Sequence, residues 1–174
     1  MSMISLVLTA IADDRPGLVE RLSDVIAAHE GNWIESSMSR LAGTFAGLVR
    51  VEVPQERVEA LEAALSRLSA DGIATTLKRS ETSHETHGQA ARMTVICQDH
   101  PGIVHAVAAV LAAKGVSITE LETEVSAGSM SGERMFRAQV DVVLPVDLSA
   151  GDLSTSLETL AGDLMAEIDF SDTV

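Results

Sequence analysis

The sequence predicts an α+β fold made of two tandem ferredoxin-like modules, each with the element order βαββαβ, an antiparallel sheet and one helical face. Two observations lead to this prediction. A short motif occurs twice, and the same succession of strand and helix patterns surrounds each copy. The chain has 174 residues, 46% of them hydrophobic, which is enough for two small domains with cores of their own.

The repeat is visible residue by residue. Residues 14–19 read Asp-Arg-Pro-Gly-Leu-Val, and residues 99–104 read Asp-His-Pro-Gly-Ile-Val. A second block, which contains Phe45, recurs around Phe136, and the longer second copy has its extra residues in a Ser- and Gly-rich loop at 126–132. Two matching blocks in the same order indicate a duplication.

Apolar periodicity places the elements of each copy, since a period near 3.6 predicts helices and alternation predicts strands. The first module is predicted to contain strands at Ile4–Ala12, Asn32–Leu41, Val49–Val53 and Ile73–Lys78, and helices carrying Val19, Leu22 and Ile26, then Val58, Leu61, Leu65 and Leu68. The second is predicted to contain strands at Ala91–Cys97, Val116–Val125, Met135–Leu144 and Ala166–Ser171, and helices carrying Val104, Val107 and Leu111, then Leu153, Leu157, Leu160 and Leu164. Module 1 therefore spans 1–79, a polar linker 80–90 and module 2 91–174.

Composition excludes several classes of function. The net charge of −14 repels a phosphate backbone, so neither direct nucleic-acid binding nor docking on an anionic membrane is expected. Aromatic residues make up only 2% of the chain, too few for base stacking. The apolar start at 1–12 is too short for a membrane span and lacks a basic segment before it, so a cytoplasmic location is expected.

The duplicated Asp-x-Pro-Gly turn, at 14–17 and 99–102, is the main candidate site. Its proline suits the first position of a helix, and its aspartate could accept hydrogen bonds from the first helical amides. Its glycine lets a ligand or another backbone come close, and free amides at a helix start favour an anion such as a carboxylate. The alternative is a purely structural strand-to-helix turn.

Cys97 is the only cysteine, so it cannot form an internal disulfide. With His100 and His105 nearby, it could form a catalytic Cys–His pair. Its counterpart in the first copy is Ala12, which favours a small buried side chain instead.

A second polar group, His84-x-x-His87 with Glu81 and Glu85, could bind a metal ion. It lies in the predicted linker without a rigid scaffold, so no metal site is expected. Trp33 is the only tryptophan, and it is either a partly buried anchor or one wall of a ligand pocket. Arg40 and Arg50 could flank it and pair with carboxylates, or could be solvated.

Residues 14–19, a helix, and then Gly31-Asn32-Trp33-Ile34 resemble the opening of an ACT domain. Residues 99–104, a helix, and then Gly115-Val116-Ser117-Ile118 resemble a second one. Two such modules with little else resemble the glycine cleavage system transcriptional repressor family. Carried over by motif, the implied ligand-binding residues are Asp14, Arg15, Pro16, Gly17, Leu18, Asn32 and Trp33 in the first module and Asp99, His100, Pro101, Gly102, Ile103 and Ser117 in the second.

The resemblance implies an amino acid or other small ligand at interfaces between ACT modules, and a homodimer formed through sheets or helices. The duplicated turn, the charge and the absence of a catalytic set predict a non-enzymatic regulator with no cofactor and no catalytic residues. Because the acidic surface suits a protein partner better than DNA, we expect action on transcription or metabolism through such a partner. The alternatives are a ligand-independent interaction and oligomerisation module, and an enzyme that depends on Cys97.

The two copies also differ. The distance from Pro16 to Gly31 is one residue longer than the distance from Pro101 to Gly115, which predicts an extra residue at the end of the first helix. The two sites are therefore expected to be unequal, with the Asn32–Trp33 side the better candidate.

Overall fold

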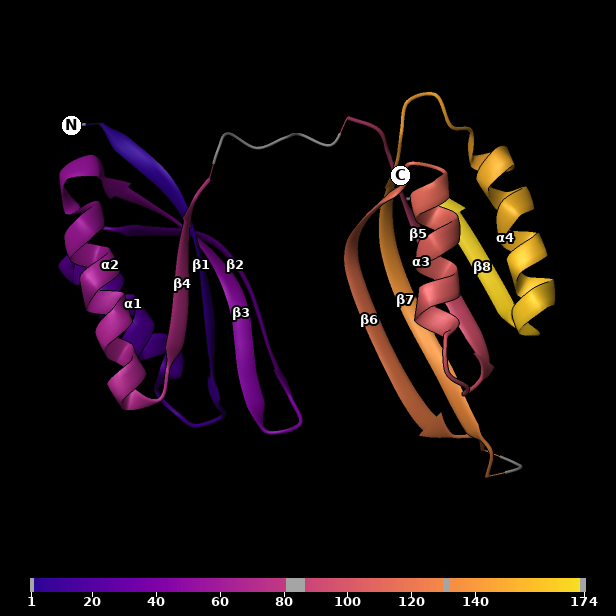
Figure 1. Ribbon diagram of the computed structural model, residues 1–174, viewed down its shortest axis with the longest axis horizontal. Helices are drawn as coiled ribbons and strands as arrows, with labels where there is room; N and C mark the ends of the chain where they lie inside the picture. Colours follow the sequence, from indigo (N-terminus) through magenta and orange to yellow (C-terminus); the bar gives the residue numbers. More distant parts are fainter. Residues whose placement is uncertain (1, 81–86, 130–131, 173–174) are drawn as a thin grey trace. The chain divides into compact units, whose positions relative to one another are not determined.

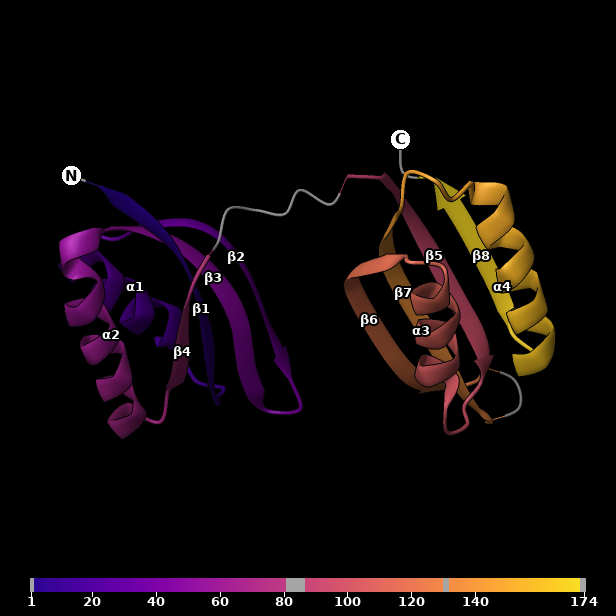
Figure 2. The same cartoon turned by 45° about the horizontal axis from the view of Figure 1, so that its top comes forward.

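The structure is a computed structural model that describes residues 2–80, 87–129 and 132–172. The chain divides into two compact units, Met1–His84 and Glu85–Val174. The described residues of each unit form a four-stranded antiparallel sheet with two α-helices on one face (Figure 1; Figure 2). Among these residues, no helix is long and apolar enough to cross a membrane.

Each unit has the element order βαββαβ. Unit 1 consists of β1 Met3–Asp13, α1 Leu18–Ala28, β2 Asn32–Leu41, β3 Thr44–Pro54, α2 Val58–Arg67 and β4 Ala74–Arg79, with 3₁₀ turns η1 Gln55–Arg57 and η2 Leu68–Asp71. Unit 2 consists of β5 Gln89–Gln98, α3 Ile103–Ala113, β6 Ser117–Ala127, β7 Arg134–Leu144, α4 Ala150–Leu164 and β8 Glu167–Asp172. The strand orders are β2-β3-β1-β4 and β6-β7-β5-β8. The predicted ferredoxin-like fold class is confirmed.

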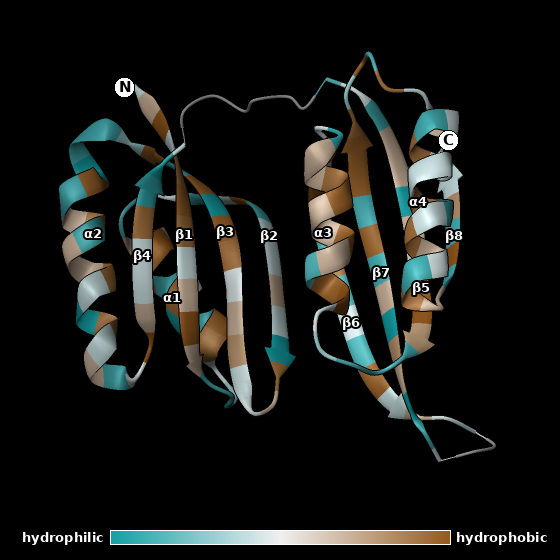
Figure 3. Cartoon of the chain, turned by 45° about the vertical axis from the view of Figure 1, so that its right-hand side comes forward, coloured by the Kyte–Doolittle hydropathy of each residue, from teal (hydrophilic) through white to brown (hydrophobic). Residues whose placement is uncertain are grey.

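Alternation along the central strands builds the two cores. The even-numbered residues from Leu6 to Ala12 on β1 are buried against the helices, as are Val49, Val51 and Val53 on β3. In unit 2, the same alternation appears on β7, where apolar and polar bands follow one another (Figure 3). Each core consists of residues from its own unit.

The end of the first helix corrects one prediction. Gly31 amide donates to Ile26 carbonyl, and Val116 amide makes the same bond to Leu111, so these two residues correspond. Glu30 therefore corresponds to Gly115, and both have left-handed backbones, with φ of 59° and 69°. The expected extra residue does not exist. The left-handed position after the helix is thus held by Glu30 in unit 1, and Gly31 lies where unit 2 has Val116.

Candidate functional site

The Asp-x-Pro-Gly turns differ from the expectation in their local geometry. The helices begin at Leu18 and Ile103, so both prolines precede the helix rather than occupying its first position. Gly17 has φ 90° and ψ 0°, the values of the third residue of a type II turn, in which proline is favoured just before. An added Cβ there would meet nothing within 4 Å, so backbone conformation explains the glycine without any close approach by other protein atoms.

The aspartates of the two turns do not cap the helices, because neither helix has a side-chain cap. Asp14 pairs with Arg40 at 3.1 Å, and Asp99 pairs with Arg134 at 3.1 Å. Each aspartate also donates its backbone amide to the neighbouring β-hairpin, at Gly43 in unit 1 and at Arg134 in unit 2. The turn is thus fixed to the end of the sheet by main-chain and side-chain bonds.

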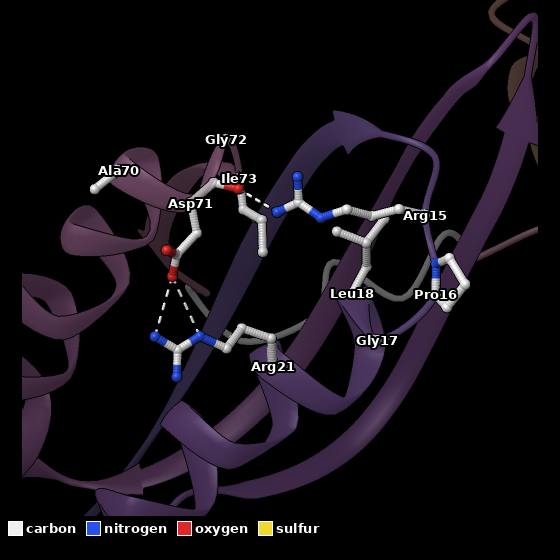
Figure 4. Close-up of a pocket in the computed structure, with 9 residues that line it drawn as sticks. All are labelled: Arg15, Pro16, Gly17, Leu18, Arg21, Ala70, Asp71, Gly72 and Ile73. Carbon is white, nitrogen blue, oxygen red and sulfur yellow. Dashed lines mark hydrogen bonds and ion pairs between the residues drawn. The ribbon is translucent and has the colours of Figure 1, made fainter.

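An open cleft of about 710 Å³ lies beside the turn of unit 1 (Figure 4). It lies between the start of α1 and the segment that joins η2 to β4. Two arginine side chains enter it, and both bind the same residue. The Arg21 guanidinium pairs with the Asp71 carboxylate at 3.0 Å, and the Arg15 guanidinium donates to the Asp71 backbone carbonyl. The cleft is lined by Arg15, Pro16, Gly17, Leu18, Arg21, Ala70, Asp71, Gly72 and Ile73.

The charge of this cleft contrasts with that of the chain. Two guanidinium groups face one carboxylate, so the cleft carries a net positive charge within a chain of net charge −14. Both members of the Arg21–Asp71 pair are about half exposed, which leaves guanidinium donors accessible to solvent. Planar guanidinium donors match carboxylate oxygens in bidentate geometry. The arrangement can therefore hold a small molecule through a carboxylate or a similar anion.

The predicted site residues of unit 1 separate into two groups. Four of them, Arg15 to Leu18, line the cleft together. Asn32 and Trp33 begin β2 and pair with Glu52 and Val51 of β3. These two β3 residues pair in turn with Ser5 and Leu6 of β1. The turn follows the opposite end of β1, about 26 Å away at the usual rise per strand residue.

Trp33 is half-buried and packs against the core of unit 1, as an anchor does. Within one module, therefore, the turn and the start of the second strand do not meet. A ligand that touches both groups would have to bind the turn of one ACT module and the strand of another. Arg40 and Arg50 both have carboxylate partners, Asp14 and Glu35.

The corresponding position in unit 2 has a different set of side chains. His100 and Ala106 stand where the first unit has Arg15 and Arg21, and Leu164 stands where it has Asp71. The left-handed residue before the last strand is Met165 instead of Gly72. Ile103 is buried in the core, and Ser117 begins β6 just as Asn32 begins β2. The guanidinium pair is therefore specific to unit 1.

Sequence reasoning missed Arg21 and Asp71. Arg21 lies one helical turn after Gly17, so its spacing placed it on the same end of α1 as the motif. Asp71 precedes Gly72 directly before the last predicted strand, and the order of strands brings that point to the end of β1. The helical spacing of Arg21 and the βαββαβ order of strands together place both residues beside the turn.

Cys97 has the environment of a packing residue. Its side chain is buried, and burial, followed by the charge of Asp99, raises the pKa of its thiol. A raised pKa disfavours the thiolate that a nucleophile needs. His100 makes its hydrogen bond to the Pro101 carbonyl at 3.1 Å. The geometry thus offers no activated Cys–His pair in the described part of unit 2.

The metal hypothesis concerned His84, His87, Glu81 and Glu85. Three of these residues lie outside the described part of the chain. Within 2–80, 87–129 and 132–172, no group of three or more His, Cys, Asp or Glu side chains could hold a metal ion.

Comparisons with known proteins agree with this fold. Residues 5–76 and residues 91–143 each match a family described as ACT domain. A crystal structure of an unknown protein from Galdieria sulphuraria is 30% identical, covering 99% of this chain and 100% of that chain, with a TM-score of 0.84. A protein proposed to be a glycine cleavage system transcriptional repressor is 18% identical, covers 99% of both chains and has a TM-score of 0.76, a likeness of fold. No curated protein matches the sequence.

Proposed function

This chain belongs to the ACT-domain family, with two such domains in tandem, and we propose that it is a cytoplasmic, non-enzymatic regulator that senses an amino acid. ACT domains are typically ligand-sensing regulatory modules, and they often oligomerise. The output proposed for this chain is a change in transcription or metabolism, exerted through a protein partner. The solved structure proposed to be a glycine cleavage repressor shares this fold and motivates the same class of role.

The cleft beside the unit 1 turn carries the ligand part of the proposal. Arg15 and Arg21 are held in place by Asp71, so their donors are oriented before a ligand arrives. The carboxylate of an amino acid would pair with them, and Gly17 keeps the rim of the cleft free of side-chain atoms. Asn32 lies at the far end of the sheet from its own cleft, so in this proposal it would contribute from the first ACT module of a second chain. Unit 2, without the arginine pair, would bind weakly or not at all.

Thermal unfolding against a panel of the common amino acids tests this proposal. A ligand at about ten times its Kd raises the free energy of unfolding by about 1.4 kcal/mol, which raises the Tm of a unit of this size by about 5 °C or more. We expect at least one amino acid to do so. Arg21→Gln should abolish the increase because it replaces one guanidinium of the cleft with a shorter, uncharged amide.

Arg57→Gln is the matched control. Arg57 forms an exposed ion pair with Glu30 at 2.7 Å, with exposure similar to that of the Arg21–Asp71 pair, but away from the cleft. The control variant should keep the ligand-induced increase in Tm. Equal loss in both variants, or no amino acid that raises the Tm of the unsubstituted chain, would contradict ligand sensing at this cleft.

A ligand-independent interaction and oligomerisation module is the second candidate. The long exposed edge strand of unit 2 favours it, because open edges invite strand pairing. In that case the chain would reach its full assembly state without ligand, and Arg21→Gln would leave assembly unchanged. Sedimentation velocity with and without the amino-acid panel distinguishes the two functions.

A further inference from the structure

The outer edge of unit 2 differs in character from its counterpart in unit 1. The edge strand β6 pairs with β7 on one side, and the sheet order leaves its other side without a strand in unit 2. All of Ser117–Ala127 is exposed. After a bulge between Ile118 and Glu120, the strand runs in regular register with β7 to its end. It therefore offers a regular row of backbone donors and acceptors to an incoming strand.

The face of β6 on the helix side is apolar. Ile118, Leu121 and Val125 lie opposite buried residues of β7, yet they are 40%, 43% and 43% exposed. Val104 of α3, at 42% exposure, extends this surface, and a small apolar hollow continues from it between α3 and β6. In unit 1, the positions of Leu121 and Val125 are held by Ser36 and Arg40. Unit 1 has half-buried Trp33 and Met38 at the positions of Ile118 and Thr123, so the part of the strip found in unit 2 alone is the exposed pair Leu121 and Val125.

The open face of β6 is acidic. Glu120, Glu122 and Glu124 lie on it in alternating positions, and none of them forms an ion pair with a described residue. Unit 1 has Glu35, Ser37 and Ser39 at the same positions. The rest of the open face adds Asp141, Glu167 and Asp169 against only Arg92 and Arg137, and Arg92 is bound to Asp141.

From these observations we propose that β6 accepts an extended segment of a partner protein as a fifth strand, with alternating apolar and basic side chains. The apolar side chains cover Leu121 and Val125, while the basic side chains lie beside the three glutamates. A second copy of β6 fits less well, because antiparallel pairing would bring two rows of glutamates together. This inference rests on the proposed function: the β6 edge would be the surface through which the chain contacts its protein partner.

A labelled synthetic peptide of about ten residues, alternating valine and lysine, probes the edge of the full chain without ligand. Fluorescence anisotropy should show binding, and a valine–glutamate peptide should not bind. Glu122→Ser with Glu124→Ser, which copies Ser37 and Ser39 of unit 1, should weaken binding about tenfold. Leu121→Ser, which copies Ser36, should weaken it by a similar factor, about tenfold.

The matched control is Glu59→Ser with Glu62→Ser on the exposed face of α2, which changes the net charge equally. It should leave binding intact. Equal weakening by both pairs would mean non-specific attraction and would overturn the proposal. So would undiminished binding of a peptide N-methylated on alternate residues, or a dimer of the unsubstituted chain that Leu121→Ser splits. Since no amino acid is present, failure here would leave sensing at the unit 1 cleft standing.

Discussion

At the scale of single residues, ion pairs at strand positions tie neighbouring strands together, and the pair between Arg92 and Asp141 is the best aligned of them. It links β5 to β7 through two hydrogen bonds, of 2.5 and 2.8 Å. The guanidinium lowers the pKa of the Asp141 carboxyl below its ordinary value of 3.8. The folded state therefore holds the carboxylate more strongly in its ionised form than the unfolded state does.

We expect Asp141→Asn to lower the stability of unit 2 in a pH-dependent way. The stabilisation from the lowered pKa is fully present above the unfolded value near 3.8 and is lost as the pH falls through the lower, folded value. The difference in unfolding free energy between the two proteins should thus be constant near neutral pH and shrink below about pH 4. Urea titrations at several pH values measure it.

Glu35→Gln is the control for that experiment. Glu35 pairs with Arg50 across β2 and β3 at 3.2 Å, but its side chain is 73% exposed. An exposed pair contributes little to stability. The role assigned to the Arg92–Asp141 pair would be contradicted if the loss of unfolding free energy in Asp141→Asn stayed the same down to acid pH.

At the scale of elements, the ends of α1 and α3 show how one backbone shape is met by two different residues. Glu30 and Gly115 both adopt left-handed backbone conformations after their helices. A side chain in this region costs about 1 to 2 kcal/mol. An added Cβ at Gly115 would meet only Pro145, at an ordinary contact distance of 3.8 Å. Backbone strain is therefore the main cost of a side chain there.

We expect Gly115→Ala to lower the unfolding free energy of unit 2 by about 1 kcal/mol, as measured by chemical denaturation. The reverse change, Glu30→Gly, should stabilise unit 1 by less, because it also removes the exposed ion pair with Arg57. If Gly115→Ala left the unfolding free energy of unit 2 unchanged, the backbone strain assigned to this position would be absent.

The element order and most boundaries were predictable from sequence, because burial imposes a strict period on strands such as β1 and β3. Positions fixed by backbone shape were less predictable. Gly31 looked equivalent to Gly115, whereas the left-handed residue that matches Gly115 is Glu30. The site was only half predictable. The motif identified Arg15 to Leu18, but Arg21 and Asp71 reach the cleft only through the three-dimensional return of the chain.

At the scale of the whole molecule, the residues that the structure describes form two hydrophobic cores that share no residue. Leu8 in unit 1 and Leu111 in unit 2 are both fully buried. Replacing a buried leucine with alanine costs about 2 to 5 kcal/mol. We expect Leu8→Ala to reduce amide protection against hydrogen exchange in unit 1 only, and Leu111→Ala in unit 2 only.

Hydrogen exchange followed by mass spectrometry measures the two units in one experiment, and each variant serves as the control for the other. Equal loss of protection in both units after either substitution would show a single cooperative folding unit. A division into separate units would let a ligand stabilise one of them without the other.

The main-chain bond from each turn aspartate to its hairpin has an evolutionary consequence. Asp14 amide bonds to the Gly43 carbonyl, and Asp99 amide makes the equivalent bond to the Arg134 carbonyl. Such a bond survives replacement of the side chains, so after duplication the two turns could keep their shape while their surroundings drifted apart. One copy could then retain a cationic cleft while the other acquired an edge strand suited to a protein partner, so that the two duplicated domains took on different roles.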